Sequence, residues 1–168
     1  MPVGPAQSYY LALVGAWSGV LEVERPPATH GVLARLLALL ARATGRYRFE
    51  TTLAATDRGF HHTTQVRKLG VLLLATEEDI ALGADGRSLV MTGTMRPLLW
   101  RAAPYRAEGH VDAESRGATY HIPWLGAELV QCTQRQGADL AFTHQTPWLC
   151  TRALLVRWST AEGAIVRS

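Results

Sequence analysis

The chain has 168 residues, of which 48% are hydrophobic and 18% are charged. That length suits a single domain spanning 1–168 with a substantial core, and the composition is too apolar for a disordered chain. The formal net charge of +3 comes mainly from arginines scattered along the sequence. Without a basic run or interleaved aromatic and basic residues, we expect no nucleic-acid partner.

The N-terminal residues lack the basic segment, sustained apolar run and cleavage site of a secretory signal. The longest apolar stretch, GVLARLLALLARA, is interrupted by Arg35 and Arg42 and is too short to cross a bilayer. Cys132 and Cys150 fall in separate predicted strands, where we expect free thiols. These features predict a cytoplasmic protein without a membrane span.

In chain order, a short N-terminal turn leads into a strand from Ala16 to Glu24, which ends at two prolines. Next comes a predicted amphipathic helix from Thr29, a suitable N-cap, to Gly45, a suitable C-cap. Its apolar face repeats at helical spacing, at Leu33, Leu36, Leu37 and Leu40.

Short alternating segments fill the rest of the chain and are separated by turn sequences such as TDRG and GADGR. The stretch from Arg96 to Glu108 is harder to assign because Pro97 and Pro104 each remove a backbone donor. The remaining predicted strands are YRFETTLAA, FHHTTQVRKL, VLLLATEEDIAL, SLVMTGTM, HVDA, ATYHI, AELVQCTQ, LAFTHQT and LCTRALLVRW.

About nine or ten strands in sequential hairpins are too many for one flat sheet, so we predict an all-β fold closed as an antiparallel up-and-down barrel. The amphipathic helix after the first strand would cover one end. The Gly15-x-Trp17-x-Gly19 cluster that opens this meander resembles the start of calycin-like barrels: lipocalins, fatty-acid-binding proteins and nitrobindin-like proteins. The resemblance implies that Trp17 plugs the closed end of the barrel, with the two glycines allowing tight strand entry and close packing.

Side chains alternate across a strand, so the apolar set of each segment identifies the inner face and its polar members. Four inward ionisable groups, His62, Glu78, Tyr120 and His144, are the candidate catalytic residues, because burial shifts pKa values toward those suited to proton transfer. A bulge in the TEED segment would turn Glu78 outward, and neither face of AELVQCTQ is clearly apolar, which leaves Gln131 and Glu128 unassigned. The candidate ligand-binding residues are Trp17, Tyr47, Phe49, Thr64, Leu74, Met91 and Phe142.

No metal site is predicted, because the adjacent His61 and His62 point to opposite faces and no His-x-His or paired Cys motif occurs. Nitrobindin-like barrels bind haem through an axial His in a strand beginning Thr-Arg-His-Leu or similar. The corresponding segment here is Thr151-Arg152-Ala153-Leu154, with Ala153 at the ligand position. We therefore expect no cofactor, and a haem-binding, nitrobindin-like protein remains an alternative that needs His144 as the ligand.

The main prediction is a barrel that binds a hydrophobic small molecule and promotes a cofactor-independent cyclisation or isomerisation. This resembles small barrel cyclases of polyketide-like specialised metabolism, in which the cavity holds a reactive conformer and polar groups move a proton. The alternative of another class is a carrier or sensor of a lipid-like ligand. Carriers commonly hold a carboxylate with a buried Arg or Tyr pair, and no inward Arg emerges clearly from the alternation. A homodimer is left open.

Overall fold

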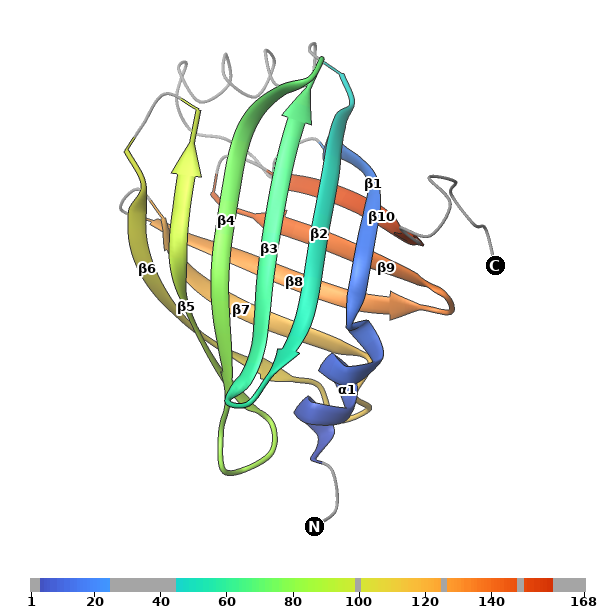
Figure 1. The fold of residues 1–168 in the computed structure, drawn as a ribbon, viewed down its shortest axis with the longest axis vertical. Coiled ribbons are helices and arrows are strands. Elements are labelled where there is room, and N and C mark those ends of the chain that lie inside the picture. The colour runs from blue at the N-terminus through green and yellow to red at the C-terminus, as the bar shows by residue number, and fades with distance from the viewer. Residues whose placement is uncertain (1–3, 25–44, 99–100, 125–126, 148–149, 159–168) are drawn as a thin grey trace.

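The structure is a computed structural model that describes residues 4–24, 45–98, 101–124, 127–147 and 150–158. Ten antiparallel strands form a closed barrel, and a short helix precedes the first strand (Figure 1). The predicted all-β barrel is confirmed. The elements are α1 (Pro5–Leu13), β1 (Gly15–Glu24), β2 (Tyr47–Thr56), β3 (Gly59–Lys68), β4 (Val71–Leu82), β5 (Ser88–Pro97), β6 (Ala103–Val111), β7 (Gly117–Trp124), β8 (Ala127–Gln136), β9 (Asp139–Gln145) and β10 (Cys150–Trp158).

Each strand pairs with its neighbours in sequence, and β1 pairs with β10 to close the barrel. In Figure 1 the front wall of β2, β3 and β4 crosses the back wall of β7 to β10 at a steep angle. Every described strand is therefore paired on both sides, which satisfies the backbone donors and acceptors that an open edge would expose. This ten-strand architecture fits a calycin-like barrel.

The two prolines of the stretch from Arg96 to Glu108 lie at the ends of strands. Pro97 is the last residue of β5 and Pro104 the second residue of β6, positions where a missing donor disturbs few ladder bonds. The predicted separate strand HVDA is wrong, because His110 and Val111 continue β6 from Ala103. Tyr105 thereby joins the barrel wall.

The helix α1 was not predicted, since the residues before β1 were interpreted as a turn. Its buried side chains are Ala6, Tyr9, Tyr10 and Leu13, and this i, i+3, i+4, i+7 spacing is that of an amphipathic helix. Pro5 occupies the first turn, where its missing N–H costs nothing. In Figure 1 the helix lies at the end of the barrel where β1 begins.

Hydrogen bonds tie α1 to the barrel. The Tyr9 hydroxyl lies 2.7 Å from Thr133 Oγ1 on β8, and the Tyr10 hydroxyl contacts the Tyr120 hydroxyl on β7. Burial is the main cause that raises the pKa of both Tyr10 and Tyr120, so both phenols stay protonated at neutral pH. The helix, together with these phenols, closes one end of the core.

The segment that resembles calycin barrels occupies the junction of α1 and β1. Trp17 is buried, and its indole N–H donates to the Leu13 carbonyl at 2.8 Å. Gly15 has a φ of 137°, and a Cβ added at Gly19 would lie 2.1 Å from the Leu154 carbonyl oxygen. Both positions therefore require glycine. The predicted helix from Thr29 to Gly45 falls, apart from its last residue, outside the described residues.

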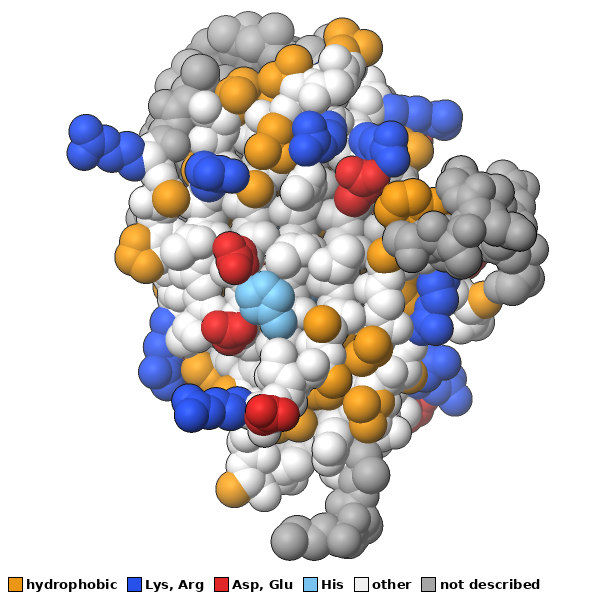
Figure 2. Space-filling model, viewed as in Figure 1, with side chains coloured by type: hydrophobic (Ala, Val, Ile, Leu, Met, Phe, Trp, Pro, Cys, Tyr) orange, Lys and Arg blue, Asp and Glu red, His pale blue; other side chains and the backbone are white. Residues whose placement is uncertain are grey.

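The outer surface carries mixed charge. Figure 2 shows Lys and Arg side chains spread singly over the face in view, interspersed with acidic groups. On β3 the side chain of His61 lies outside, 2.9 Å from Asp79 Oδ1 and 3.7 Å from Glu77 Oε1, whereas its neighbour His62 is buried inside.

In the described residues we find no helix with the length and apolar character needed to cross a bilayer.

Candidate functional site

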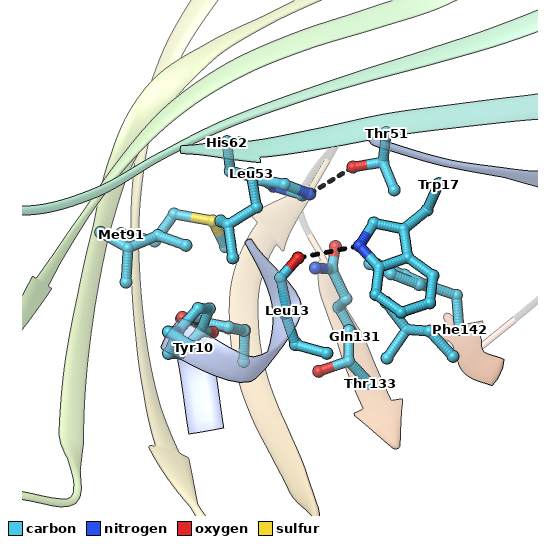
Figure 3. A pocket seen from close by; sticks show the side chains of 13 residues that line it. Tyr10, Leu13, Trp17, Thr51, Leu53, His62, Met91, Gln131, Thr133 and Phe142 are labelled. Atoms are coloured by element: carbon cyan, nitrogen blue, oxygen red, sulfur yellow. Dashed lines mark hydrogen bonds between the residues drawn. The ribbon is translucent and has the colours of Figure 1, made fainter. Parts of the chain in front are cut away.

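Among the described residues, two cavities that share a wall lie in the barrel interior. The first, which we call the deep compartment, has a volume of about 30 Å³ and lies against α1 (Figure 3). It is lined by Tyr10, Leu13, Trp17, Thr51, Leu53, His62, Ile80, Met91, Tyr120, Gln131, Thr133, Leu140 and Phe142.

The second cavity, the wide compartment, has a volume of about 220 Å³. Leu21, further along β1 than Trp17, is among its residues, so it lies farther from α1. Gln131 and Phe142 line both compartments and form part of the boundary between them. The lining residues are Leu21, Phe49, Thr64, Val66, Leu74, Thr76, Glu78, Met95, Tyr105, Ile122, Leu129, Gln131, Phe142, His144, Thr146 and Thr151.

A chain of buried polar groups connects the two compartments. His62 Nδ1 lies 2.5 Å from Glu78 Oε2, and because a carboxylate only accepts, Nδ1–H is the donor. The other carboxylate oxygen of Glu78 accepts a hydrogen bond from the Tyr105 hydroxyl. On the far side of the imidazole, His62 Nε2 lies 2.6 Å from Thr51 Oγ1, and Thr51 donates to the Thr63 carbonyl at 2.9 Å.

Antiparallel pairing brings these residues together. His62 on β3 stands directly opposite Glu78 on β4, and Glu78 stands opposite Gly93 on β5. A Cβ at Gly93 would lie 2.9 Å from Glu78 Cγ, so the missing side chain makes room for the glutamate. Tyr105 on β6 pairs with the same glycine and reaches the carboxylate from the other side.

The charge on Glu78 is stabilised although the side chain is only 3% exposed. Burial alone would raise the pKa of Glu78, but the charge of His62 and the hydrogen bonds from His62 and Tyr105 outweigh it, and the pKa is lowered. Burial and the neighbouring carboxylate raise the pKa of Tyr105. At neutral pH the site therefore holds an ionised carboxylate and a protonated phenol.

His144 lies in the wide compartment in a different environment. Loss of hydration among apolar neighbours lowers the pKa of His144 to about 4, an effect that the Glu78 charge opposes and the His62 charge reinforces. Its Nδ1 lies 3.3 Å from Thr151 Oγ1. The ring of Phe142 contacts both imidazoles, with centroid distances of 6.3 Å to His62 and 5.9 Å to His144. The imidazole of His144 is therefore neutral at neutral pH.

The predicted site residues all belong to the barrel wall, but they divide between the compartments. Of the catalytic candidates, His62 and Tyr120 line the deep compartment, whereas Glu78 and His144 line the wide one. Only His62 and Glu78 are hydrogen-bonded to each other. The ligand-binding candidates also divide: the deep compartment includes Trp17 and Met91, the wide one Phe49, Thr64 and Leu74, and both include Phe142.

Tyr47 lies outside both linings; it packs against the core, with the Lys68 ammonium 4.6 Å from its ring centroid. Sequence reasoning missed Tyr105, whose segment was left unassigned because of its prolines. It also left Gln131 unassigned, and that side chain is 7% exposed and faces both compartments. Alternation from Val111 back through Ala107 would have placed Tyr105 on the inner face.

Among the described residues, no three His, Cys, Asp or Glu side chains lie together in a way that would hold a metal ion. Neither cavity has a Lys or Arg in its described lining. No known family model matches the chain, and no curated protein matches it either.

Proposed function

We propose that the wide compartment binds a small hydrophobic molecule of one or two rings and that Glu78 moves a proton on it. The observation that carries this proposal is the hydrogen-bonded chain of Tyr105, Glu78, His62 and Thr51, because it holds an ionised carboxylate in the wall of an apolar cavity. Buried carboxylates with specific charge partners in a cavity are a common feature of catalytic sites.

The size of the cavity limits the substrate. A protein cavity of about 150 Å³ holds one benzene molecule, and the wide compartment measures about 220 Å³. A ring compound with a short substituent is therefore a better candidate than a long polyene or polyketide chain. The deep compartment, at about 30 Å³, has room for water alone, since one water needs about 10 to 15 Å³.

The proposed reaction is a cofactor-independent isomerisation or cyclisation that begins at a C–H bond next to a carbonyl. Two further lone-pair positions remain on the Glu78 carboxylate after it accepts from His62 and Tyr105. In a β,γ-unsaturated carbonyl substrate, Glu78 would take the carbon-bound proton, the electron pair of that bond would form a dienolate with its charge on the carbonyl oxygen, and the proton would return to the γ carbon as the carbonyl group forms again. Because its pKa is lowered, Glu78 is a weak base, so the substrate C–H must be an acidic one.

A carrier of a lipid-like ligand is the second candidate, and one observation favours it. Both oxygens of Glu78 accept hydrogen bonds from protein side chains, as expected of a group that stabilises the barrel structure and takes no part in a reaction. The ligand of such a carrier would not be a fatty-acid anion, because no Lys or Arg is among the described residues that line either cavity.

The haem-binding alternative does not fit the residues present. Ala153, at the position of the axial His, is buried and has no donor atom. His144 faces a cavity of about 220 Å³, only about half again the volume that one benzene ring requires. A nitrobindin-like function therefore finds no support in the barrel interior.

Deuterium exchange of 2-tetralone tests the proposed proton transfer, since this bicyclic ketone has acidic C–H bonds beside its carbonyl. We expect the wild-type protein to accelerate exchange at these carbons in D2O, measured by proton NMR. Glu78→Gln should lose the acceleration and still bind the ketone. Glu77→Gln, its outward-facing neighbour on β4, is the matched control and should exchange like the wild type. If the wild type binds 2-tetralone but exchanges no faster than Glu78→Gln, the carrier explanation replaces the enzyme.

A further inference from the structure

Gln131, in the middle of β8, has an amide without a hydrogen-bond partner among the described residues. The side chain is 7% exposed and lines both compartments. No described residue hydrogen-bonds to its amide. In Figure 3 that amide lies in the same space as the side chains of His62 and Thr51, across the deep compartment.

Most buried polar groups in folded proteins are hydrogen-bonded to protein or to ordered water. Among the described residues, the fully buried polar side-chain atoms that lack a partner are Lys68 Nζ and Thr76 Oγ1, and the Gln131 amide is not one of them. This amide therefore borders the space of the cavities that Gln131 lines, where it is available to a bound molecule or to water.

A second available polar group lies beside it. Gln131 on β8 stands directly opposite His144 on β9, and directly opposed side chains have Cβ atoms about 4.5 to 5.5 Å apart. His144 contacts Thr151 through Nδ1, and no described residue hydrogen-bonds to its Nε2. Both side chains line the wide compartment, so an amide and an imidazole nitrogen face the same space.

We propose that Gln131 and His144 together anchor an uncharged oxygen-containing group of the ligand, such as a carbonyl, carboxamide or hydroxyl. This inference rests on the proposed function, because it assigns the polar end of the same ligand. The amide offers both donor and acceptor atoms, and a neutral imidazole offers one or the other at Nε2.

An anionic ligand is disfavoured because no described residue of the cavity wall balances a negative charge. No Lys or Arg is among its described lining residues, His144 is neutral, and the Glu78 carboxylate shares the space. A carboxylate ligand would therefore lose its hydration and meet a like charge. The anchor lies on the back wall of the barrel, on β8 and β9, whereas Glu78 extends from β4, so a ligand held there would be presented to the carboxylate.

Three probes of nine non-hydrogen atoms and nearly the same shape test the anchor. Benzamide carries the uncharged polar group, benzoate is its anionic counterpart, and α-methylstyrene is its apolar counterpart. NMR titration at pH 7 gives the affinity of each probe for the wild type, Gln131→Met and His144→Phe. Gln134→Met, the same substitution at an exposed position of β8, is the matched control.

We expect each anchor variant to weaken benzamide binding about 3- to 10-fold, the factor that one or two neutral hydrogen bonds provide. The affinity for α-methylstyrene should stay the same or rise, which also shows that the variants keep the cavity intact. Gln134→Met should bind all three probes like the wild type, and the wild type should bind benzoate at least about 10-fold more weakly than benzamide.

Equal benzamide affinity in the wild type and both anchor variants would overturn the anchor while leaving the binding cavity in place. Benzoate that binds as tightly as benzamide would overturn the assignment of an uncharged ligand. If none of the probes binds the wild type up to its solubility limit, the proposed small-molecule function fails together with the anchor.

Discussion

The neutral imidazole of His144 makes the stability of the barrel depend on pH in a specific window. Loss of hydration lowers the pKa of His144 from 6.5 to about 4 in the folded protein. As the pH falls below 6.5, the unfolded chain takes up a proton at this site that the folded protein does not. The contribution of this histidine to the free energy of unfolding is therefore fully present above pH 6.5, and it is lost progressively as the pH falls from 6.5 to the folded-state pKa of about 4.

The magnitude follows from the shift. Each unit of pKa difference corresponds to about 1.4 kcal/mol, so this histidine removes about 2 kcal/mol of unfolding free energy between pH 7 and pH 5, and about 3 kcal/mol by pH 4. The perturbation is His144→Gln, which keeps a polar side chain and removes the titration. Urea unfolding at half-unit steps of pH gives the free energy for both proteins. Titrating groups that do not interact with His144 cancel to first order in the difference.

We expect the wild-type stability to fall relative to His144→Gln by about 2 kcal/mol over this interval. His110→Gln, at an exposed position of β6, should keep the wild-type slope. NMR titration of the His144 ring protons gives the folded-state pKa independently. Parallel curves for the wild type and His144→Gln would mean that water hydrates this imidazole in the folded protein and that the wide compartment is not the apolar environment described.

Three further substitutions test the packing and hydrogen bonds around the site. Gly93→Ala should destabilise the barrel by about 3 kcal/mol in urea unfolding, because the new Cβ would overlap the β4 backbone beside Glu78; a loss below about 1 kcal/mol would mean that the strands separate easily. Tyr10→Phe leaves the Tyr120 hydroxyl buried without its partner and should lower the free energy of unfolding by about 1 to 3 kcal/mol. The double variant Tyr10→Phe with Tyr120→Phe removes both hydroxyls and should recover part of this loss. Tyr105→Phe removes a hydrogen bond to a carboxylate, so we expect a loss of about 1.5 to 3 kcal/mol at pH 7. Because that bond helps lower the pKa of Glu78, the stability that this carboxylate loses between its unfolded pKa of 4.5 and its lower folded pKa should be smaller in the variant, and the loss should end at a higher pH; an unchanged acid transition would contradict the assignment.

Alternation within single strands was enough to place most of the inner wall. His62, Tyr120 and Glu78 all lie inside as that pattern predicts, because the barrel core is one-sided and a strand cannot slip by one residue without exposing its apolar set. The same reasoning could not show that Glu78 and His62 touch, or that Gly93 makes room for them. Those facts depend on the register between strands, which the turns and the closure of the whole barrel set.

The misses have separate physical causes. The helix α1 was interpreted as a turn because its nine residues are few for a helix, although Ala6, Tyr9, Tyr10 and Leu13 carried the helical spacing. Tyr105 was hidden by the prolines at the ends of β5 and β6. Gln131 could not be assigned because both faces of the first half of β8 are partly buried, which removes the polar and apolar contrast that alternation requires.

The cost of a buried, ionised Glu78 is what favours the enzyme over the carrier. Taking a carboxylate out of water carries a desolvation penalty on the order of several kcal/mol, which its partners must offset. A carrier of an uncharged ligand gains nothing from an ionised carboxylate in its wall, and apolar residues would line its cavity with less cost. A proton-transfer enzyme needs that carboxylate in the cavity wall, with fixed partners that keep it ionised. If the wild type catalyses deuterium exchange and Glu78→Gln does not, proton transfer explains why an ionised carboxylate lies in the cavity wall, which ligand binding alone does not explain.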